Sequence, residues 1–305
     1  MAAETWLLAF APGSCPSFCY MGLRDDLLQL IPIERVRNPP PQVAVLRFDG
    51  LIGMRGPRAL SLRRFAAAIE RAFALRQLKA VALAINSPGG SPAQSSLLYR
   101  RIRQLADEKG VPVIAFTEDV AASGGYWLAL AADEIFADET SLLGSIGVIS
   151  ASFGFAEALR KFGIQRRLYT AGENKSLLDP FLTEDPKGVE RLLALQQDMH
   201  ESFKELVRHR RHVKLKGEES LIFSGEVFTG RRALELGLID GIADLRSLMR
   251  QRFGDEVRLR AIEPERRRFS LLSWFGLPRR PDTADVVVDL VARLEERMIW
   301  ARLGL

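Results

Sequence analysis

Ser123 stands among small residues in the motif AASGGYW (residues 121–127), where its hydroxyl could act as a nucleophile. The apolar run at residues 111–116 predicts a buried strand before it, and the apolar run at residues 126–132 predicts a helix after it. A serine in the first turn of that helix lies at the positive end of the helix dipole. The alternative role is structural, because serine is also a common helix N-cap.

A nucleophilic serine needs a base that takes its proton. The histidines, His200, His209 and His212, lie in one Arg-rich stretch that predicts a helix, and none is near a glycine-rich turn. We expect them on a solvated helix face without a metal, which leaves lysine, aspartate or glutamate as the base. Lys175, in the polar loop at residues 172–176, is the candidate, and a solvated loop lysine is the alternative. Lysine acts as a base only when uncharged, so burial or a nearby positive charge must lower the lysine pKa from about 10.4.

Acyl transfer also needs backbone amides directed at the developing oxyanion, each contributing about 3 to 4 kcal/mol. Gly89 and Gly90 follow an apolar strand predicted at residues 80–85, and a glycine turn there lets a substrate carbonyl approach the backbone. The amide of Gly124, directly after Ser123, is the second expected donor. A tight turn that binds nothing is the alternative for a Pro-Gly-Gly sequence.

Strands and helices alternate around these residues. Apolar segments at residues 43–48, 80–85 and 111–117 predict strands, and the segments between them predict helices. Uninterrupted apolar strands that alternate with helices favour a mostly parallel sheet covered on both faces, with the site on loops at the strand ends. The predicted fold class is therefore α/β.

Further elements are predicted after the serine motif. They are helices at residues 156–162 and 187–212, a helical pair at residues 230–252, a strand at residues 167–169 and a last helix at residues 287–303. We expect three regions: an N-terminal extension (1–41), a folded domain (42–255) and a basic, amphipathic tail (256–305). Within the tail, residues 266–280 combine arginines with apolar and aromatic side chains, which is typical of contact with an anionic membrane surface or with another subunit.

The composition excludes several classes of protein. With 47% hydrophobic and 27% charged side chains in 305 residues, the chain has the composition of a globular protein. Cys15 and Cys19 have no second pair, so we expect neither a zinc site nor a disulfide framework, and we expect no cofactor. The net charge of +5 follows no pattern of a nucleic-acid reader, so we expect no nucleic-acid partner.

The sequence also bears on localisation. No segment approaches the roughly 18 to 20 uninterrupted apolar residues of a membrane-spanning helix. Residues 1–20 match a secretory signal poorly. We therefore expect a cytoplasmic protein, with peripheral contact to the inner membrane as the further possibility that the tail raises.

Taken together, the motifs resemble the signal peptide peptidase A (SppA) family of serine-lysine peptidases. The motifs are SPGG after one strand, ASGGY after the next, GSIGV with its serine 22 residues past Ser123, Lys175 at 52 residues past Ser123, and GLID at residues 237–240. The resemblance spans about residues 42–253, and the order and spacing fit the single-copy bacterial members of the family.

The resemblance implies a fold like that of Clp protease and crotonase, with repeated ββα units, and makes residues 42–255 a peptidase domain. It implies that Ser123 is the nucleophile and Lys175 the general base and acid. Gly89, or the neighbouring Gly90, and Gly124 would form the oxyanion hole.

The resemblance further implies that Ser145 orients the lysine amine. Family members form ring-like or bowl-shaped oligomers, in which the serine and the lysine of one dyad can come from adjacent protomers. Family substrates are short apolar peptides such as cleaved signal peptides. The sequence departs from the family pattern in that the usual N-terminal membrane anchor is not evident, which favours cytoplasmic peptides or membrane contact through residues 266–280.

Two other functions remain open on the residues alone. One is a crotonase-like enzyme that acts on acyl-coenzyme A with the same glycine oxyanion hole. The other is an inactive oligomeric scaffold that binds membranes or peptides, in which Ser123 and Lys175 are structural.

Overall fold

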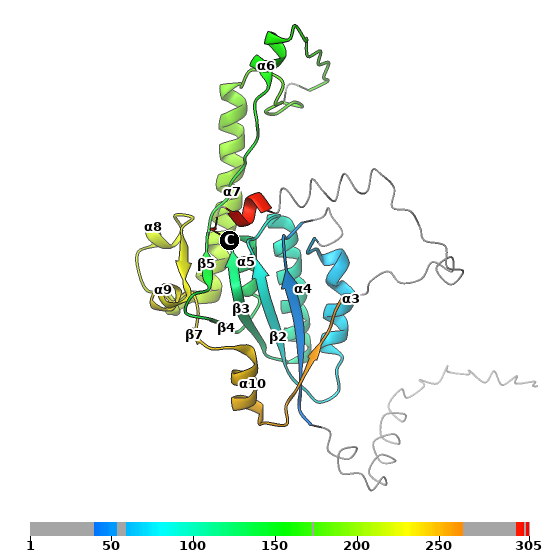
Figure 1. Cartoon of the computed structure of the whole chain (residues 1–305), viewed down its shortest axis with the longest axis vertical. Helices are drawn as coiled ribbons and strands as arrows, with labels where there is room; N and C mark the ends of the chain where they lie inside the picture. The colour runs from blue at the N-terminus through cyan, green and yellow to red at the C-terminus, as the bar shows by residue number, and fades with distance from the viewer. Residues whose placement is uncertain (1–39, 54–58, 173, 265–296, 302, 305) are drawn as a thin grey trace, which may run out of the picture. The chain divides into compact units, whose positions relative to one another are not determined.

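The computed structural model describes residues 40–53, 59–172, 174–264, 297–301 and 303–304. The chain divides into two compact units, Met1–Pro40 and Pro41–Leu305. The described part of the second unit contains an eight-stranded sheet with helices packed on it (Figure 1). No helix among the described residues is long and apolar enough to cross a membrane.

The elements follow one another along the chain as a series of strands with helices between them. The strands are β1 (Gln42–Asp49), β2 (Leu78–Ser87), β3 (Val113–Ala122), β4 (Glu134–Ala137), β5 (Leu142–Gly144), β6 (Val227–Thr229), β7 (Gly241–Ile242) and β8 (Arg258–Ala261). The helices are α3 (Leu62–Phe73), α4 (Pro92–Lys109), α5 (Gly124–Ala129), α6 (Ala156–Lys161), α7 (Pro186–Arg211), α8 (Glu219–Ile222), α9 (Gly230–Glu235) and α10 (Leu245–Phe253), with a short 3-10 helix at His212–Lys214.

The sheet is mostly parallel. Its strand order is β6-β5-β3-β2-β1-β8, and β4 pairs with β3 and with β7. All of these pairs are parallel except β5 with β6. Parallel neighbours need crossover connections, which α3 supplies between β1 and β2 and α4 supplies between β2 and β3. The predicted α/β class, with a mostly parallel sheet flanked by helices, is confirmed.

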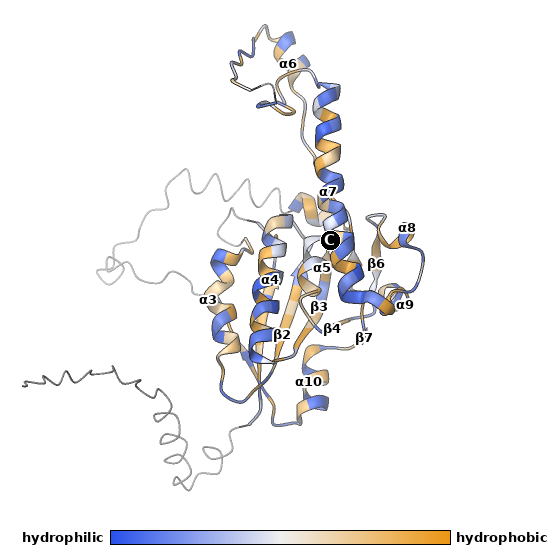
Figure 2. Ribbon diagram, turned by 180° about the vertical axis from the view of Figure 1, so that it is seen from behind, coloured by the Kyte–Doolittle hydropathy of each residue, from blue (hydrophilic) through white to orange (hydrophobic). Residues whose placement is uncertain are grey.

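Alternate residues of β2 enter two different hydrophobic cores. Val81, Leu83 and Ile85 lie in the larger core, which also holds the buried faces of α3, α4 and α5. Ala80 and Ala82 lie in a second core that includes Met249 of α10. Successive side chains of a strand point to opposite faces, so β2 is covered on both sides. This explains why its sequence is an unbroken apolar run, and Figure 2 shows the central strands in the hydrophobic colour.

Helix α5 is a short element inside the larger core. All six of its residues are buried. The hydroxyl of Tyr126 donates a hydrogen bond to the carbonyl of Leu238 over 2.7 Å, and burial raises the pKa of Tyr126. The helix begins at Gly124, two residues earlier than the apolar run predicts, so that Ser123 directly precedes it.

Helix α7 is buried mainly in its second half. Phe203, Val207 and Arg211 are buried there, whereas Leu193 and Leu195 in the first half are 58% and 52% exposed. The predicted helix at residues 187–212 agrees with α7 to within one residue at each end.

The strand predicted at residues 167–169 is wrong, because this segment has no regular secondary structure. Tyr169 is 90% exposed, and the segment pairs with no strand among the described residues. Its neighbourhood is held instead by an ion pair between Arg166 and Asp179. A short segment cannot form a strand where no second strand offers hydrogen-bond partners.

The predicted N-terminal extension and C-terminal tail fall only partly within the described residues. Strand β8 lies beyond residue 255, where we place the start of the tail, and it pairs in parallel with β1. Residues 266–280 and most of the helix predicted at residues 287–303 lie outside the described residues. The N-terminal extension, apart from Pro40 and Pro41, lies outside them as well.

Candidate active site

Ser123 lies between the end of β3 and the first residue of α5. Its φ of +50° and ψ of −119° lie in a region that a residue with a side chain seldom adopts, at a cost of order 1 to 3 kcal/mol. The surrounding bonds hold this conformation: its N–H donates to the carbonyl of Gly144 over 2.8 Å, and its carbonyl accepts from the N–H of Trp127 over 3.0 Å. Although Ser123 occupies the N-cap position, its side chain makes no capping hydrogen bond. The hydroxyl is therefore not used to cap the helix.

Gly89 packs directly behind Ser123. A β-carbon added to Gly89 would lie 2.7 Å from the nitrogen of Gly124 and 2.8 Å from the β-carbon of Ser123, so no side chain fits at this position. Gly90 is equally enclosed, since a β-carbon there would lie 2.0 Å from the carbonyl oxygen of Ile52. Their φ values of +105° and +134° also favour glycine. The turn after β2 and the start of α5 are thus in direct backbone contact.

The amides of these glycines differ in their hydrogen bonds. The N–H of Gly89 donates to the hydroxyl of Ser87 over 3.2 Å. The N–H of Gly124 is in the first turn of α5 and has no acceptor within the helix. Within the described segments, no acceptor faces the N–H of Gly90 either. Gly90 and Gly124 consequently offer donors next to the serine, and a β-carbon added to Gly124 would lie only 3.3 Å from the nitrogen of Gly90.

Ser145 follows the strand that pairs with the end of β3. The register of β3 with β5 places Ala122 opposite Gly144, so Ser123 and Ser145 follow two paired residues. Ser145 has a φ of +49°, and its N–H donates to the carbonyl of Glu226 over 2.6 Å. The structure thus brings together the ends of β2, β3 and β5, with the predicted glycines and both serines on them.

Lys175 lies elsewhere along the chain, in the turn between α6 and α7. It is exposed, and its N–H donates to the carbonyl of Gly172 over 3.2 Å. Among the described residues, no hydrogen bond or ion pair connects its amine with Ser123 or Ser145. A cavity of about 410 Å³ lies in the same part of the chain, lined by residues between Ser152 and Glu184, and it contains none of the predicted site residues.

His200 makes a contact next to Ser145 that the sequence did not predict. It lies on α7, is half-buried, and places its Nε2 atom 3.0 Å from the carbonyl oxygen of Ile146, one residue after Ser145. The expectation of a solvated histidine is therefore wrong at this position. A helical apolar pattern that continues through Phe203 and Val207 is the only sign in the sequence that His200 faces inward.

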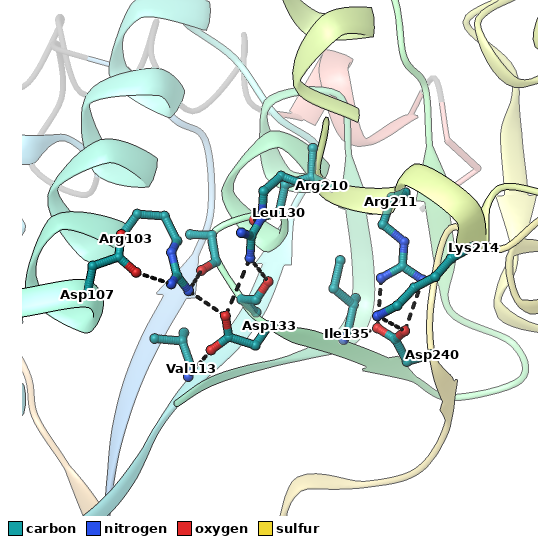
Figure 3. A network of polar contacts seen from close by, with 12 residues as sticks. Arg103, Asp107, Val113, Leu130, Asp133, Ile135, Arg210, Arg211, Lys214 and Asp240 are labelled. Atoms are coloured by element: carbon teal, nitrogen blue, oxygen red, sulfur yellow. Dashed lines mark hydrogen bonds and ion pairs between the residues drawn. The ribbon is translucent and has the colours of Figure 1, made fainter. Parts of the chain in front are cut away.

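A polar network holds the other end of α5 (Figure 3). Arg210 of α7 donates to the carbonyls of Leu130 and Ala132 over 2.9 and 2.7 Å. Arg103 of α4 donates to the carbonyl of Ala131 and to the carboxylate of Asp133. Guanidinium groups are favourable at the C-terminal end of a helix, where carbonyls lack intrahelical partners. The helix that Ser123 precedes is therefore held at both ends.

A buried ion pair joins the end of α7 to Asp240, just before β7. Arg211, with a side chain 3% exposed, pairs with Asp240 over 2.7 Å, and Lys214 reaches the same carboxylate over 2.8 Å. Burial raises the pKa of the Asp240 carboxyl, but hydrogen bonds from Arg211, Lys214 and the N–H of Ile135 outweigh this effect and hold the pKa below its usual value. Asp240 is thus a charged anchor inside the fold.

The site holds no cluster that would suggest a metal. Among the described residues, no group of three or more His, Cys, Asp or Glu side chains could hold a metal ion. What the arrangement offers is an uncapped serine hydroxyl beside glycine amides that point to no acceptor in the described chain, which is a geometry suited to acyl transfer.

Comparison with known proteins supports the peptidase interpretation. Residues 106–254 match the model of peptidase family S49. The chloroplastic serine protease SPPA of Arabidopsis thaliana is 33% identical over 214 residues, which cover 67% of this chain and 31% of that protein. A signal peptide peptidase of the SppA type from Enterococcus faecium is 28% identical over 167 residues, covering 55% of this chain and 48% of that protein.

One relative with a higher sequence identity is not named as a protease. The protein called Na(+)/H(+) antiporter NhaA in Brucella abortus is 48% identical over 288 residues, which cover 92% of this chain but only 39% of that protein. This chain thus spans about two fifths of that relative's length. Among solved structures, a 1510-N membrane-bound stomatin-specific protease is 15% identical with a TM-score of 0.43, covering 74% of this chain and 99% of that one. From the family match and the protease relatives together, we conclude that residues 106–254 are similar to peptidase family S49, and that the chain is similar to proteases of the SppA type.

Proposed function

We propose that the protein is a serine endopeptidase that hydrolyses short apolar peptides, such as cleaved signal peptides, through Ser123 and Lys175. One observation carries the proposal. Ser123 has a strained backbone conformation, its hydroxyl is not used as a cap, and it lies beside the glycines of the turn after β2. The family match supports the general activity, and the dyad and the substrate class are the finer part of the proposal.

The proposed reaction is acyl transfer in two steps. The uncharged amine of Lys175 accepts the proton of the Ser123 hydroxyl while the oxygen attacks the peptide carbonyl carbon. The N–H groups of Gly124 and Gly90 donate to the oxyanion, since the N–H of Gly89 donates to the hydroxyl of Ser87. Lys175 returns the proton to the leaving amine as the C–N bond breaks. In the second step, Lys175 takes a proton from a water molecule, which attacks the ester between the acyl group and Ser123. The acid is released, and the proton returns to the Ser123 oxygen. Ser145 orients the amine in both steps.

We further propose that Lys175 acts on Ser123 of a neighbouring copy in a homo-oligomer. Two observations support this arrangement. Among the described residues, the amine of Lys175 has no hydrogen bond or ion pair with the serine of its own chain. Large apolar side chains are exposed in the same part of the chain, which is unusual on a monomer's surface; among them are Phe153, Phe162, Tyr169, Leu193 and Leu195. A location in the cytoplasm with peripheral contact to the inner membrane stays a prediction.

The test is cleavage of a mixed library of apolar peptides by the purified full-length chain, read by mass spectrometry. The wild-type protein should cleave, and Ser123→Ala and Lys175→Ala should not, while light scattering shows the same assembly for all three. Lys161→Ala, an exposed lysine of α6, is the matched control and should cleave like the wild type. Cleavage retained by Ser123→Ala would show that the nucleophile is wrong.

A further inference from the structure

The residues 144–147 form a loop that connects the end of β5 with the chain leading to α6, and this loop bears directly on Ser123. The carbonyl of Gly144 accepts the N–H of Ser123 over 2.8 Å. Ser145 is held with a positive φ, and the N–H of Gly147 donates to the carbonyl of Ser145 over 2.9 Å. A shift of the loop would therefore move both serines together.

Two contacts hold this loop from outside. On one side, β6 pairs with β5, and the carbonyl of Glu226 just before β6 accepts the N–H of Ser145. On the other side, α7 places Nε2 of His200 at 3.0 Å from the carbonyl oxygen of Ile146, whose own side chain is fully buried. A carbonyl oxygen only accepts hydrogen bonds, so Nε2 is the atom that carries the hydrogen.

The position of His200 on α7 is itself fixed. One turn further along the helix, the ring of Phe203 packs against the ring of Trp127, with centroids 4.7 Å apart. Trp127 belongs to α5, one turn after Ser123, and its N–H donates to the carbonyl of Ser123. Towards its C-terminal end, α7 binds the last carbonyls of the α5 segment through Arg210. His200 therefore reaches the loop from a helix that already packs along α5.

We propose that His200 is a positioning residue for peptide hydrolysis: by donating to the carbonyl of Ile146 it holds the loop at residues 144–147, and through that loop it holds Ser145 and Ser123 in their reactive arrangement. This inference rests on the proposed function, in which Ser123 attacks the peptide. Among the described residues, the polar contact of His200 is with the carbonyl of Ile146 and not with the hydroxyl of Ser123, so we place its action through the loop. Misplacement of reacting groups by about 1 Å can cost a hundredfold in rate.

The first experiment compares three substitutions of His200 in the full-length chain. His200→Ala removes the donor. In His200→Gln the side-chain amide can place an N–H near the position of Nε2, whereas in His200→Asn the shorter side chain places its amide near Nδ1 and cannot reach. We expect kcat to fall about tenfold or more in the Ala and Asn variants with KM changed less than about twofold, and to recover in the Gln variant. His209→Ala, an exposed histidine of the same helix, should match the wild type.

A second readout does not depend on catalysis. Amide hydrogen exchange of the peptide that covers residues 144–147 should be faster in His200→Ala and His200→Asn than in the wild type and in His200→Gln. Unchanged exchange and unchanged kcat in His200→Ala, or a Gln variant no better than Asn, would overturn the inference. If the wild type cleaves no peptide, or Ser123→Ala still cleaves, the proposed function fails, and hydrogen exchange still decides whether His200 holds the loop.

Discussion

The backbone around Ser123 is the feature on which the site depends at the scale of single residues. An ordinary capping serine bonds its own helix, whereas here the side chain makes no such bond and the φ is positive. Gly89 makes this possible, because its missing β-carbon leaves room for the nitrogen of Gly124 and the β-carbon of Ser123. The conformation of the serine thus depends on the absence of a side chain at Gly89.

Replacing Gly89 by alanine should abolish peptide cleavage, since the new methyl group must displace either Ser123 or Gly124. We expect a loss of at least about a hundredfold in kcat/KM, as for misplaced reacting groups. Gly110→Ala is the matched control: Gly110 also has a positive φ, +62°, but no atom lies within 4 Å of an added β-carbon. That variant should lose only about 1 kcal/mol of unfolding free energy and remain active. Equal activity of both variants would contradict the role of Gly89.

Helix α7 is the element that connects the site to the rest of the fold. Along its second half it contacts the 144–147 loop through His200, the ring of Trp127 through Phe203, and the end of the α5 segment through Arg210. It ends in the buried pair of Arg211 with Asp240. Because that pair is desolvated, losing one partner leaves an uncompensated charge inside the protein.

The substitution Asp240→Asn should therefore lower the free energy of unfolding by about 3 kcal/mol, since the guanidinium of Arg211 stays buried without its counter-charge. Glu139→Gln is the control, because Glu139 pairs with Arg231 on the surface, and it should change stability by less than about 1 kcal/mol. Urea unfolding at neutral pH measures both. Equal effects would show that burial does not decide the strength of the Asp240 pair.

The same carboxyl predicts a dependence on pH. The pKa of Asp240 is lower in the folded protein than in the unfolded chain, so the unfolded chain binds more protons at acidic pH. The stabilisation by Asp240 is complete above the unfolded-state pKa of about 3.9 and is lost as the pH falls through the lower folded-state value. The difference in unfolding free energy between wild type and Asp240→Asn should thus be constant from pH 7 to 5 and shrink below about pH 4. A difference that grows on acidification would contradict the assignment.

The sequence predicts elements well where a periodic pattern and burial coincide. The apolar runs at residues 80–85 and 111–117 predict β2 and β3, because strands covered on both faces need apolar residues at every position. The strand predicted at residues 167–169 is wrong because a short segment gives only a local signal, whereas strand pairing needs a neighbouring strand that the sequence does not reveal. The glycines and Ser123 are predictable as candidates since they follow adjacent strands.

The contact of His200 is not predictable in the same way. It depends on the packing of α7 against a loop more than fifty residues earlier in the chain, and the arginines around it favour a solvated face. The bonds of Asp240 depend similarly on α7 and β4 meeting near one carboxylate. Such long-range polar contacts follow from the tertiary structure rather than from the local pattern.

At the scale of the whole molecule, the apolar surface and the turn that carries Lys175 lie in one part of the chain, between β5 and the middle of α7. Exposed side chains there include Phe162 at 80% and Ile149 at 74%. Burying apolar surface stabilises a contact by about 25 cal/mol per Å², so association of copies through this part of the chain would be favourable. Assembly and completion of the site would then be one event.

Mixing two inactive variants tests this arrangement. If the serine of one copy uses the lysine of the next, random assembly of equal amounts of Ser123→Ala and Lys175→Ala chains restores about a quarter of the sites, as expected for head-to-tail contacts in a closed ring. If both residues act within one chain, the mixture stays inactive. Activity is measured after the chains are exchanged by unfolding and refolding together, with each variant refolded alone as the control.

The packing of Trp127 against Phe203 provides an intrinsic fluorescence probe inside the protein. An indole that is only 9% exposed emits at shorter wavelength than one in water, and this one lies where α5 meets the helix that follows the Lys175 turn. With Trp6, Trp274 and Trp300 replaced by phenylalanine, the emission of the remaining tryptophan would follow in real time whether α7 stays seated on α5 while copies associate and while peptides are turned over.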